Sequence, residues 1–223
     1  MAAMIFMGTG NNVFADDEVT YDSNMQTKKF DVNVKVGKDG SYTVTENIKV
    51  KFVNPRHGIY RYIPYKGNVV TIDKNGGQKK LLYYADFDLL KNDSNTDLQE
   101  DSDGNSEVLQ FGSEDSTVNE ENYKFTYQLT PQYQGDTFDY LYYNIFPTLW
   151  RNNIPKGSTF TIHFPKKTDL KSVNFFYGRY GESKNAKDVL TLKYDEKNAQ
   201  ITGTLKKSLP FKNGLTCYSD LGD

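Results

Sequence analysis

Cysteine is nearly absent from the 223-residue chain, and tryptophan and histidine are scarce. The single cysteine, Cys217, cannot form an internal disulfide, and no nearby histidine could activate its thiol as a nucleophile. The two histidines, His57 and His163, have no cysteine or carboxylate cluster at metal-ligand spacing. We therefore expect no disulfide framework, no cofactor and no zinc site.

Long apolar runs and a strong charge imbalance are also missing. No stretch reaches the roughly 20 apolar residues of a transmembrane helix. The formal net charge is −2, so there is no electrostatic reason to expect a nucleic-acid partner. The chain also lacks a G-x-S-x-G motif, a P-loop and a glycine-rich dinucleotide motif. No sequence signature therefore argues for an enzyme.

Aromatic residues are abundant, because the chain contains 17 Tyr and 14 Phe, which favour strands over helices. Apolar and polar side chains alternate along 30–36 and again along 42–52, with a turn at Lys38-Asp39-Gly40 between them. This pattern predicts a hairpin with one buried face. Further short alternating segments follow, and no segment has a helical period. The sequence predicts an all-β fold: a single two-sheet antiparallel β-sandwich, immunoglobulin-like or related, over residues 30–223.

The N-terminal residues have the order of a processed leader. An apolar start is followed by Val13-Phe14-Ala15, which places Val at −3 and Ala at −1 of a signal-peptidase site, before an acidic run. We interpret residues 1–15 as the remnant of a clipped signal peptide and residues 16–29 as a flexible segment. The alternative is a disordered apolar N-terminus.

The segment 91–106 is polar and acidic, and it predicts a long, mobile surface loop. Its end carries oxygen ligands at alternate positions, at Asp101, Asp103, Asn105 and Glu107. This spacing makes a weak calcium candidate, but the glycine is fourth in the run, whereas an EF-hand loop has it sixth. An acidic, solvated loop without a metal is the preferred interpretation.

Two charged residues interrupt rows of apolar side chains. Glu46 has apolar neighbours of the same parity in the 42–52 run, and Arg61 stands between Ile59 and Ile63 in "HGIYRYIPY", residues 57–65. A lone buried charge is heavily penalised, whereas a hydrogen-bonded pair is tolerated. We therefore predict a Glu46–Arg61 ion pair inside the sandwich. The alternative is an edge strand that exposes Arg61 to an anion.

The block "FDYLYYNIFPTLW", residues 138–150, is the densest aromatic segment. If exposed, Tyr142, Tyr143 and Trp150 would form an aromatic patch able to bind carbohydrate or peptide. Packing in the core is the more common use of such residues in an all-β chain. Both interpretations stay open at the level of sequence.

Several motifs occur in a fixed order: V-T-E at 44–46, G-I-x-R-x-I-P at 58–64, Y-x-N at 142–144, then Trp150 and I-P at 154–155. From Phe30 onward the chain resembles the bacterial predicted membrane proteins classed as domain of unknown function 2207. Members often have Trp where Tyr143 stands. The resemblance implies a signal peptide, an extracytoplasmic β-rich domain, here truncated before a membrane anchor, and one or more later transmembrane helices. It assigns no catalytic residue.

Together these observations predict the ectodomain of a membrane-anchored bacterial protein. We expect a binding or interaction module at the cell surface, with an unknown protein or an envelope glycan as its partner. One alternative is a cell-envelope hydrolase that uses two carboxylates on polysaccharide or cell wall. A second alternative is a passive structural spacer.

Overall fold

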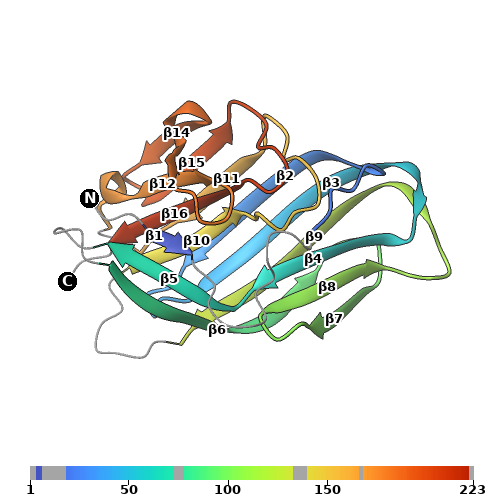
Figure 1. The fold of residues 1–223 in the computed structure, drawn as a ribbon, viewed down its shortest axis with the longest axis horizontal. Coiled ribbons are helices and arrows are strands. Elements are labelled where there is room, and N and C mark those ends of the chain that lie inside the picture. The colour runs from blue at the N-terminus through green and yellow to red at the C-terminus, as the bar shows by residue number, and fades with distance from the viewer. Residues whose placement is uncertain (1–3, 7–18, 73–77, 133–139, 166–167, 221–223) are drawn as a thin grey trace.

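A computed structural model describes residues 4–6, 19–72, 78–132, 140–165 and 168–220 (Figure 1). Among these residues there is no α-helix, and two short 3-10 turns, η1 (Leu170–Ser172) and η2 (Ala186–Asp188), are the helical elements. The described part of the chain holds no helix long and apolar enough to cross a membrane. The predicted all-β class is confirmed.

The largest sheet among the described residues, the long sheet, has nine strands. The predicted hairpin forms two of its central strands, and residues 30–36 pair antiparallel with residues 42–48. The sheet contains, in spatial order, β1 (Met4–Phe6), β5 (Lys66–Ile72), β6 (Gln78–Asn92), β9 (Val118–Pro131), β3 (Tyr42–Arg56), β2 (Met25–Val36), β11 (Thr159–His163), β15 (Gln200–Leu205) and β14 (Leu190–Asp195).

Two short sheets complete the fold. One contains β4 (Gly58–Pro64), β8 (Ser106–Gly112) and β7 (Leu98–Ser102). The other contains β10 (Tyr140–Phe146), β16 (Gly214–Asp220), β12 (Asn174–Gly178) and β13 (Lys184–Asn185). In Figure 1 the first lies at the lower right of the view, and β12 and β16 of the second lie at the upper left.

Both short sheets pack on the long sheet through aromatic side chains. Phe111 of β8 lies 4.9 Å from Phe125 of β9, measured between ring centroids. Phe146 of β10 lies 5.7 Å from Phe30 of β2, and Phe160 of β11 is also in contact with Phe146. Aromatic rings bury large apolar areas and prefer such tilted contacts. The core is therefore continuous beneath the two short sheets.

The predicted two-sheet antiparallel sandwich is wrong in two respects. The described residues form three sheets, and β11 runs parallel to β2, with Phe160 opposite Val32. Alternation fixes which side chains point inward, but it does not say how many sheets share the interior. An immunoglobulin-like strand order is not found.

The N-terminal boundaries also differ from the prediction. Strand β2 begins at Met25, and Met25 and Thr27 are buried, so residues 25–29 are not a flexible segment. Residues 4–6 pair with β5 and belong to the long sheet. Val13-Phe14-Ala15, the expected cleavage site, lies outside the described residues.

The backbones of β4 and β8 approach each other closely at the start of β4, and this contact fixes the position of β4. Gly58 lies opposite Gly112 of β8, and a Cβ atom at Gly58 would stand 1.7 Å from the carbonyl oxygen of Phe111. No other residue fits at that distance. Gly58 thus lets β4 pair with β8 and brings the next positions of β4 over the long sheet.

Candidate functional site

A cleft of about 250 Å³ opens between the two short sheets, above the long sheet. Arg61 and Ile63 of β4 line one side, and Tyr143 of β10 lines the other. Tyr127 of β9, in the long sheet, also lines it, as does Tyr180 after β12. Concave sites lined by aromatic residues with a few polar groups are typical of ligand pockets. This cleft is therefore the candidate site.

The base of the cleft contains the two charged residues that parity singled out. The Arg61 guanidinium donates from Nε to Glu46 Oε2 at 2.8 Å and from Nη2 to Glu46 Oε1 at 2.7 Å. Glu46 is 0% exposed and Arg61 is 3% exposed. Their strands, β3 and β4, belong to different sheets, so the pair ties the short sheet to the long one. Arg61 is not exposed, although β4 is an edge strand.

Two tyrosines extend the ion pair into a hydrogen-bonded chain. Tyr127 donates its hydroxyl proton to Glu46 Oε1 at 2.9 Å, and the hydroxyls of Tyr127 and Tyr143 lie 2.9 Å apart. Tyr127 uses its only hydroxyl proton in the hydrogen bond to the carboxylate, so the bond between the two hydroxyls must be donated by Tyr143. The order of donation is therefore Tyr143 to Tyr127 to Glu46.

The protonation states at the base of the cleft are fixed by burial and by the pair. Burial alone would lower the pKa of Arg61, but the Glu46 carboxylate raises it above its ordinary value overall. Burial, followed by the charge of Glu46, raises the pKa of Tyr127 and of Tyr143. Both phenols stay protonated at neutral pH, so they can form hydrogen bonds but cannot serve as bases.

The walls of the cleft carry further polar groups. Asn144 accepts a hydrogen bond from the Thr216 hydroxyl at 2.7 Å. Glu182 is the one carboxylate among the described residues that line the cleft. It accepts from the Lys184 ammonium at 2.9 Å and from the Arg179 amide at 3.0 Å, and these bonds lower its pKa. Glu182 is therefore held ionised.

Trp150 is not part of an exposed patch. It is 3% exposed, packs edge-on against Phe30 at 5.3 Å, and donates from Nε1 to the Thr27 hydroxyl at 2.8 Å. Asn152 accepts from the Thr27 amide and donates to the Met25 carbonyl. These bonds replace ladder partners at the register shift between Thr27 and residue 29. Trp150 fixes a bulge, so it has a structural role.

The other two members of the predicted aromatic patch are buried as well. Tyr142 is 9% exposed and Tyr143 is 6% exposed, and both line the cleft. The packing interpretation therefore describes Tyr142 and Tyr143 better than an exposed patch does, although both side chains also reach the cleft lining. Tyr127 was not identified from the sequence as a site residue. Its only sequence signal is its place in a buried row with Tyr123 and Phe125.

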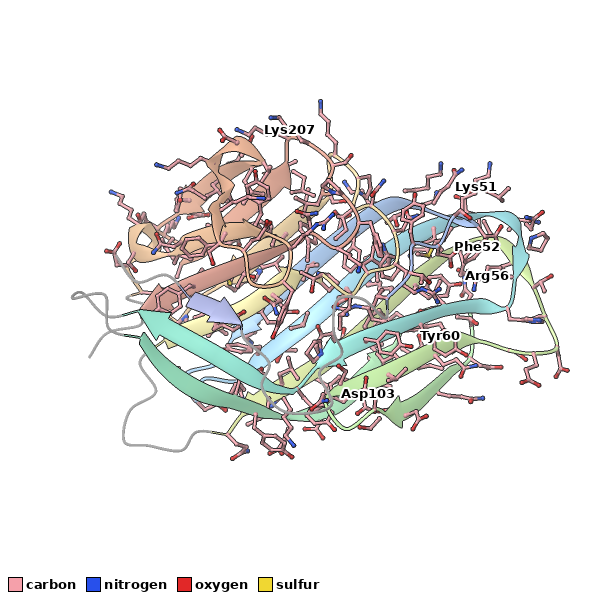
Figure 2. The ribbon with its side chains drawn as sticks, viewed as in Figure 1. Lys51, Phe52, Arg56, Tyr60, Asp103 and Lys207 are labelled. Carbon is pink, nitrogen blue, oxygen red and sulfur yellow. The ribbon has the colours of Figure 1, made fainter. Side chains whose placement is uncertain are left out.

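The predicted long acidic loop is a hairpin. Strand β7 pairs with β8, and Asp103-Gly104-Asn105 forms the turn between them (Figure 2). The Asp103 carboxylate accepts from the amides of Asn105 and Ser106 at 2.9 and 2.7 Å, and Gly104 has φ +87°. An Asp-Gly pair is typical of a tight hairpin turn.

The same geometry explains the calcium-like spacing. Asp103 uses its oxygen to hold the turn, and Asp101 caps the amide of Ser102. The described residues contain no group of three or more metal-ligating side chains placed to hold an ion. Asp103 and Asn105 therefore belong to the turn, and Asp101 and Glu107 lie on the two strands that flank it.

Neither the lone cysteine nor either histidine lines the cleft. Cys217 is fully buried in β16, and burial raises its pKa to about 12. His57 is exposed, and its Nδ1 lies 2.8 Å from the Ser116 carbonyl. His163 lies on β11, near Asn33. None of the three contacts a carboxylate that could support catalysis among the described hydrogen bonds.

Comparison with known proteins adds a family and a distant likeness. A family model described as "Predicted membrane protein (DUF2207) N-terminal domain" matches residues 26–207. No curated protein matches the chain. An M1 zinc metallopeptidase from Deinococcus radiodurans is similar in structure with a TM-score of 0.47 and 11% identity, over 89% of this chain and 43% of its own.

Leukotriene A4 hydrolase from Saccharomyces cerevisiae is similar with a TM-score of 0.42 and 10% identity. The likeness covers 87% of this chain and 29% of the hydrolase. The chain thus spans less than half of either solved protein. At TM-scores below 0.5, neither likeness supports an assignment of activity.

Proposed function

The chain belongs to the family of predicted membrane proteins described as DUF2207, of which it holds the N-terminal domain, and we propose that it is a binding module on the outer side of a bacterial membrane. One feature supports the membrane and another supports its outer side. The family description places the protein at a membrane, and Val13-Phe14-Ala15 has the spacing of a signal-peptidase site. The cleft between the two short sheets is the proposed binding site.

The proposal of a binding role rests on one observation. The floor of the cleft is held rigidly and has no net charge, and the walls of the cleft are aromatic. The Glu46–Arg61 pair and the two tyrosine hydroxyls hold one another in place through four hydrogen bonds. A site held by such supporting bonds can bind a ligand without paying for its own ordering. A passive spacer would need no such cleft.

The hydrolase alternative is less well supported by the cleft. Polysaccharide hydrolysis needs two carboxylates, one of which must hold a proton at working pH. Glu182 is the only carboxylate on the described lining, and its pKa is lowered by Lys184. Glu46 lies beneath the lining and is fully engaged by Arg61 and Tyr127. We therefore favour binding over hydrolysis.

The binding role can be tested with a matched pair of tyrosines. Tyr180 lines the cleft and is 40% exposed, whereas Tyr194 lies on β14, at the far edge of the long sheet, and is 45% exposed. The purified domain and its Tyr180→Ala and Tyr194→Ala variants should be sedimented with isolated cell envelopes. We expect binding by the wild type and by Tyr194→Ala, and reduced binding by Tyr180→Ala. Equal binding by the two variants would contradict a role for the cleft.

The proposed location needs a separate test. Cys217 is fully buried, so a membrane-impermeant maleimide should not label the native wild-type domain. Asn95→Cys places a thiol at an exposed position between β6 and β7. In intact cells that carry the full-length protein, we expect this variant to be labelled and the wild-type domain to stay unlabelled. Labelling that requires cell lysis would place the domain on the cytoplasmic side.

A further inference from the structure

We propose that the floor of the cleft recognises a hydroxyl group of a neutral glycan. This inference rests on the proposed binding function and names the class of ligand. It follows from the donor and acceptor groups that Arg61, Tyr127 and Tyr143 still present once their own hydrogen bonds are counted.

Tyr143 presents an acceptor. Its hydroxyl donates to Tyr127, because the Tyr127 hydroxyl already donates to Glu46. The lone pairs of the Tyr143 hydroxyl are therefore what a ligand meets. Tyr143 lines the cleft and retains 6% exposure. Its raised pKa keeps the group a neutral phenol.

Arg61 presents donors. A guanidinium has five N–H groups, and Arg61 uses three of them, two on Glu46 and one on the carbonyl of Tyr62. The other two have no hydrogen-bond partner among the described residues, although the side chain is 4% exposed. Buried donors are nearly always satisfied in folded proteins. A ligand in the cleft that Arg61 lines can satisfy them.

The donors and the acceptor belong to one hydrogen-bonded chain at the floor of the cleft. Arg61 Nη2 and Tyr143 are joined through Glu46 Oε1 and Tyr127 by three successive hydrogen bonds. A hydroxyl group can accept from Arg61 and donate to Tyr143 through a single oxygen atom. A carboxylate or phosphate can only accept, and an ammonium can only donate. The group that fits is therefore a neutral hydroxyl.

Charge and wall composition point to the same ligand. Glu46 neutralises Arg61, so the floor offers no net charge to an anion. Five tyrosines line the cleft above it, at positions 83, 142, 177, 180 and 218. Aromatic rings with a polar tip suit a ligand that has apolar faces and hydroxyl edges. Sugar rings have this character, whereas an extended peptide presents its N–H and C=O groups on different atoms.

The test compares two buried tyrosines. Tyr143→Phe removes the acceptor and keeps the ring. Tyr123→Phe is the matched control, because Tyr123 is 1% exposed, lies outside the cleft lining, and its hydroxyl has no partner among the described residues. Three probes should be titrated calorimetrically into each protein: a neutral N-acetylglucosamine tetramer, an inorganic polyphosphate and a tetra-alanine peptide.

We expect the saccharide to bind wild type and Tyr123→Phe equally, and Tyr143→Phe about tenfold more weakly, as for the loss of one hydrogen bond. Thermal unfolding shows whether Tyr143→Phe stays folded. If it does not, wild-type protein with 13C-labelled tyrosine gives the answer, since a resonance near the bound sugar must shift on addition of the saccharide and not of the peptide.

Three results would overturn the inference: no saccharide binding, saccharide binding that is insensitive to Tyr143→Phe, or tighter binding of the phosphate polymer or the peptide. If Tyr180→Ala still reduces envelope binding in those cases, the binding function stands and only the ligand class is wrong. If saccharide binds through Tyr143 but the envelope test shows no role for Tyr180, the cellular function fails while the chemistry of the floor stands.

Discussion

Removing one partner of the Glu46–Arg61 pair should destabilise the domain far more than removing both. Arg61→Met leaves the carboxylate of Glu46, which is 0% exposed, without its cation. Glu46→Gln leaves the buried guanidinium without an anion but keeps an acceptor for Tyr127. A stranded buried charge costs about 3–5 kcal/mol. Either single variant would therefore remove a large share of the roughly 5–15 kcal/mol by which domains are stable.

The double variant, Glu46→Gln with Arg61→Met, leaves no charge at this buried position, and the side chains keep similar volumes. Its loss should be well below the sum of the two single losses, because neither single penalty remains. Urea unfolding followed by the fluorescence of Trp150 measures all four proteins, since Trp150 is buried and becomes exposed on unfolding.

The exposed pair Lys49–Glu120, with a separation of 2.8 Å, provides the control cycle. Its side chains are 50% and 46% exposed, so water screens the attraction and we expect no resolvable coupling. The reasoning would be refuted if single variants at Glu46 and Arg61 each lost less than about 1 kcal/mol, the usual range of exposed pairs. Strictly additive losses would refute it equally.

Four further predictions each concern one side chain. Tyr123→Phe should raise the free energy of unfolding by up to about 1 kcal/mol in urea, because its buried hydroxyl lacks a partner among the described residues. Burial and nearby acids raise the pKa of Glu107, so folding is favoured when it is protonated and loses stability as pH rises through that pKa. Glu107→Gln should therefore melt higher than wild type at about pH 7 and equally at about pH 3. Cys217, whose pKa is raised to about 12, should react with a thiol reagent at neutral pH only after denaturation. Calcium titration should leave the melting temperature unchanged, because Asp103 is committed to its turn and ligands that bind only the folded state must raise it.

Much of the secondary structure could be predicted because strand alternation is a local property. The hairpin of residues 30–36 with 42–48 pairs as its pattern indicates, and the turn residues between the strands match it. The sequence also shows that Glu46 and Arg61 each interrupt a row of apolar side chains on one face of a strand. A charge in an apolar row needs a partner, and the chain offered one other charge in the same situation.

The errors concern features that alternation does not encode. The Asp103-Gly104 turn has the composition of a solvated loop, and only the pairing of β7 with β8 distinguishes the two. Trp150 could equally have faced water, and the bulge in β2 that its indole fixes depends on residues more than a hundred positions away.

The sequence by itself determined that the chain forms strands, which side chains of the alternating runs share a face, and which two charges are out of place in apolar rows. The tertiary structure decided that three sheets share the interior, that β11 lies parallel to β2, and that a cleft separates the two short sheets. The physical reason is the range of the interactions involved. Alternation reflects the geometry of successive residues, whereas sheet number and the cleft depend on how distant aromatic surfaces pack. The hydrogen-bonding groups of the cleft floor depend on sequence and on tertiary structure. The sequence supplies Arg61, Tyr127 and Tyr143, and the packing of the sheets brings them together from three different strands.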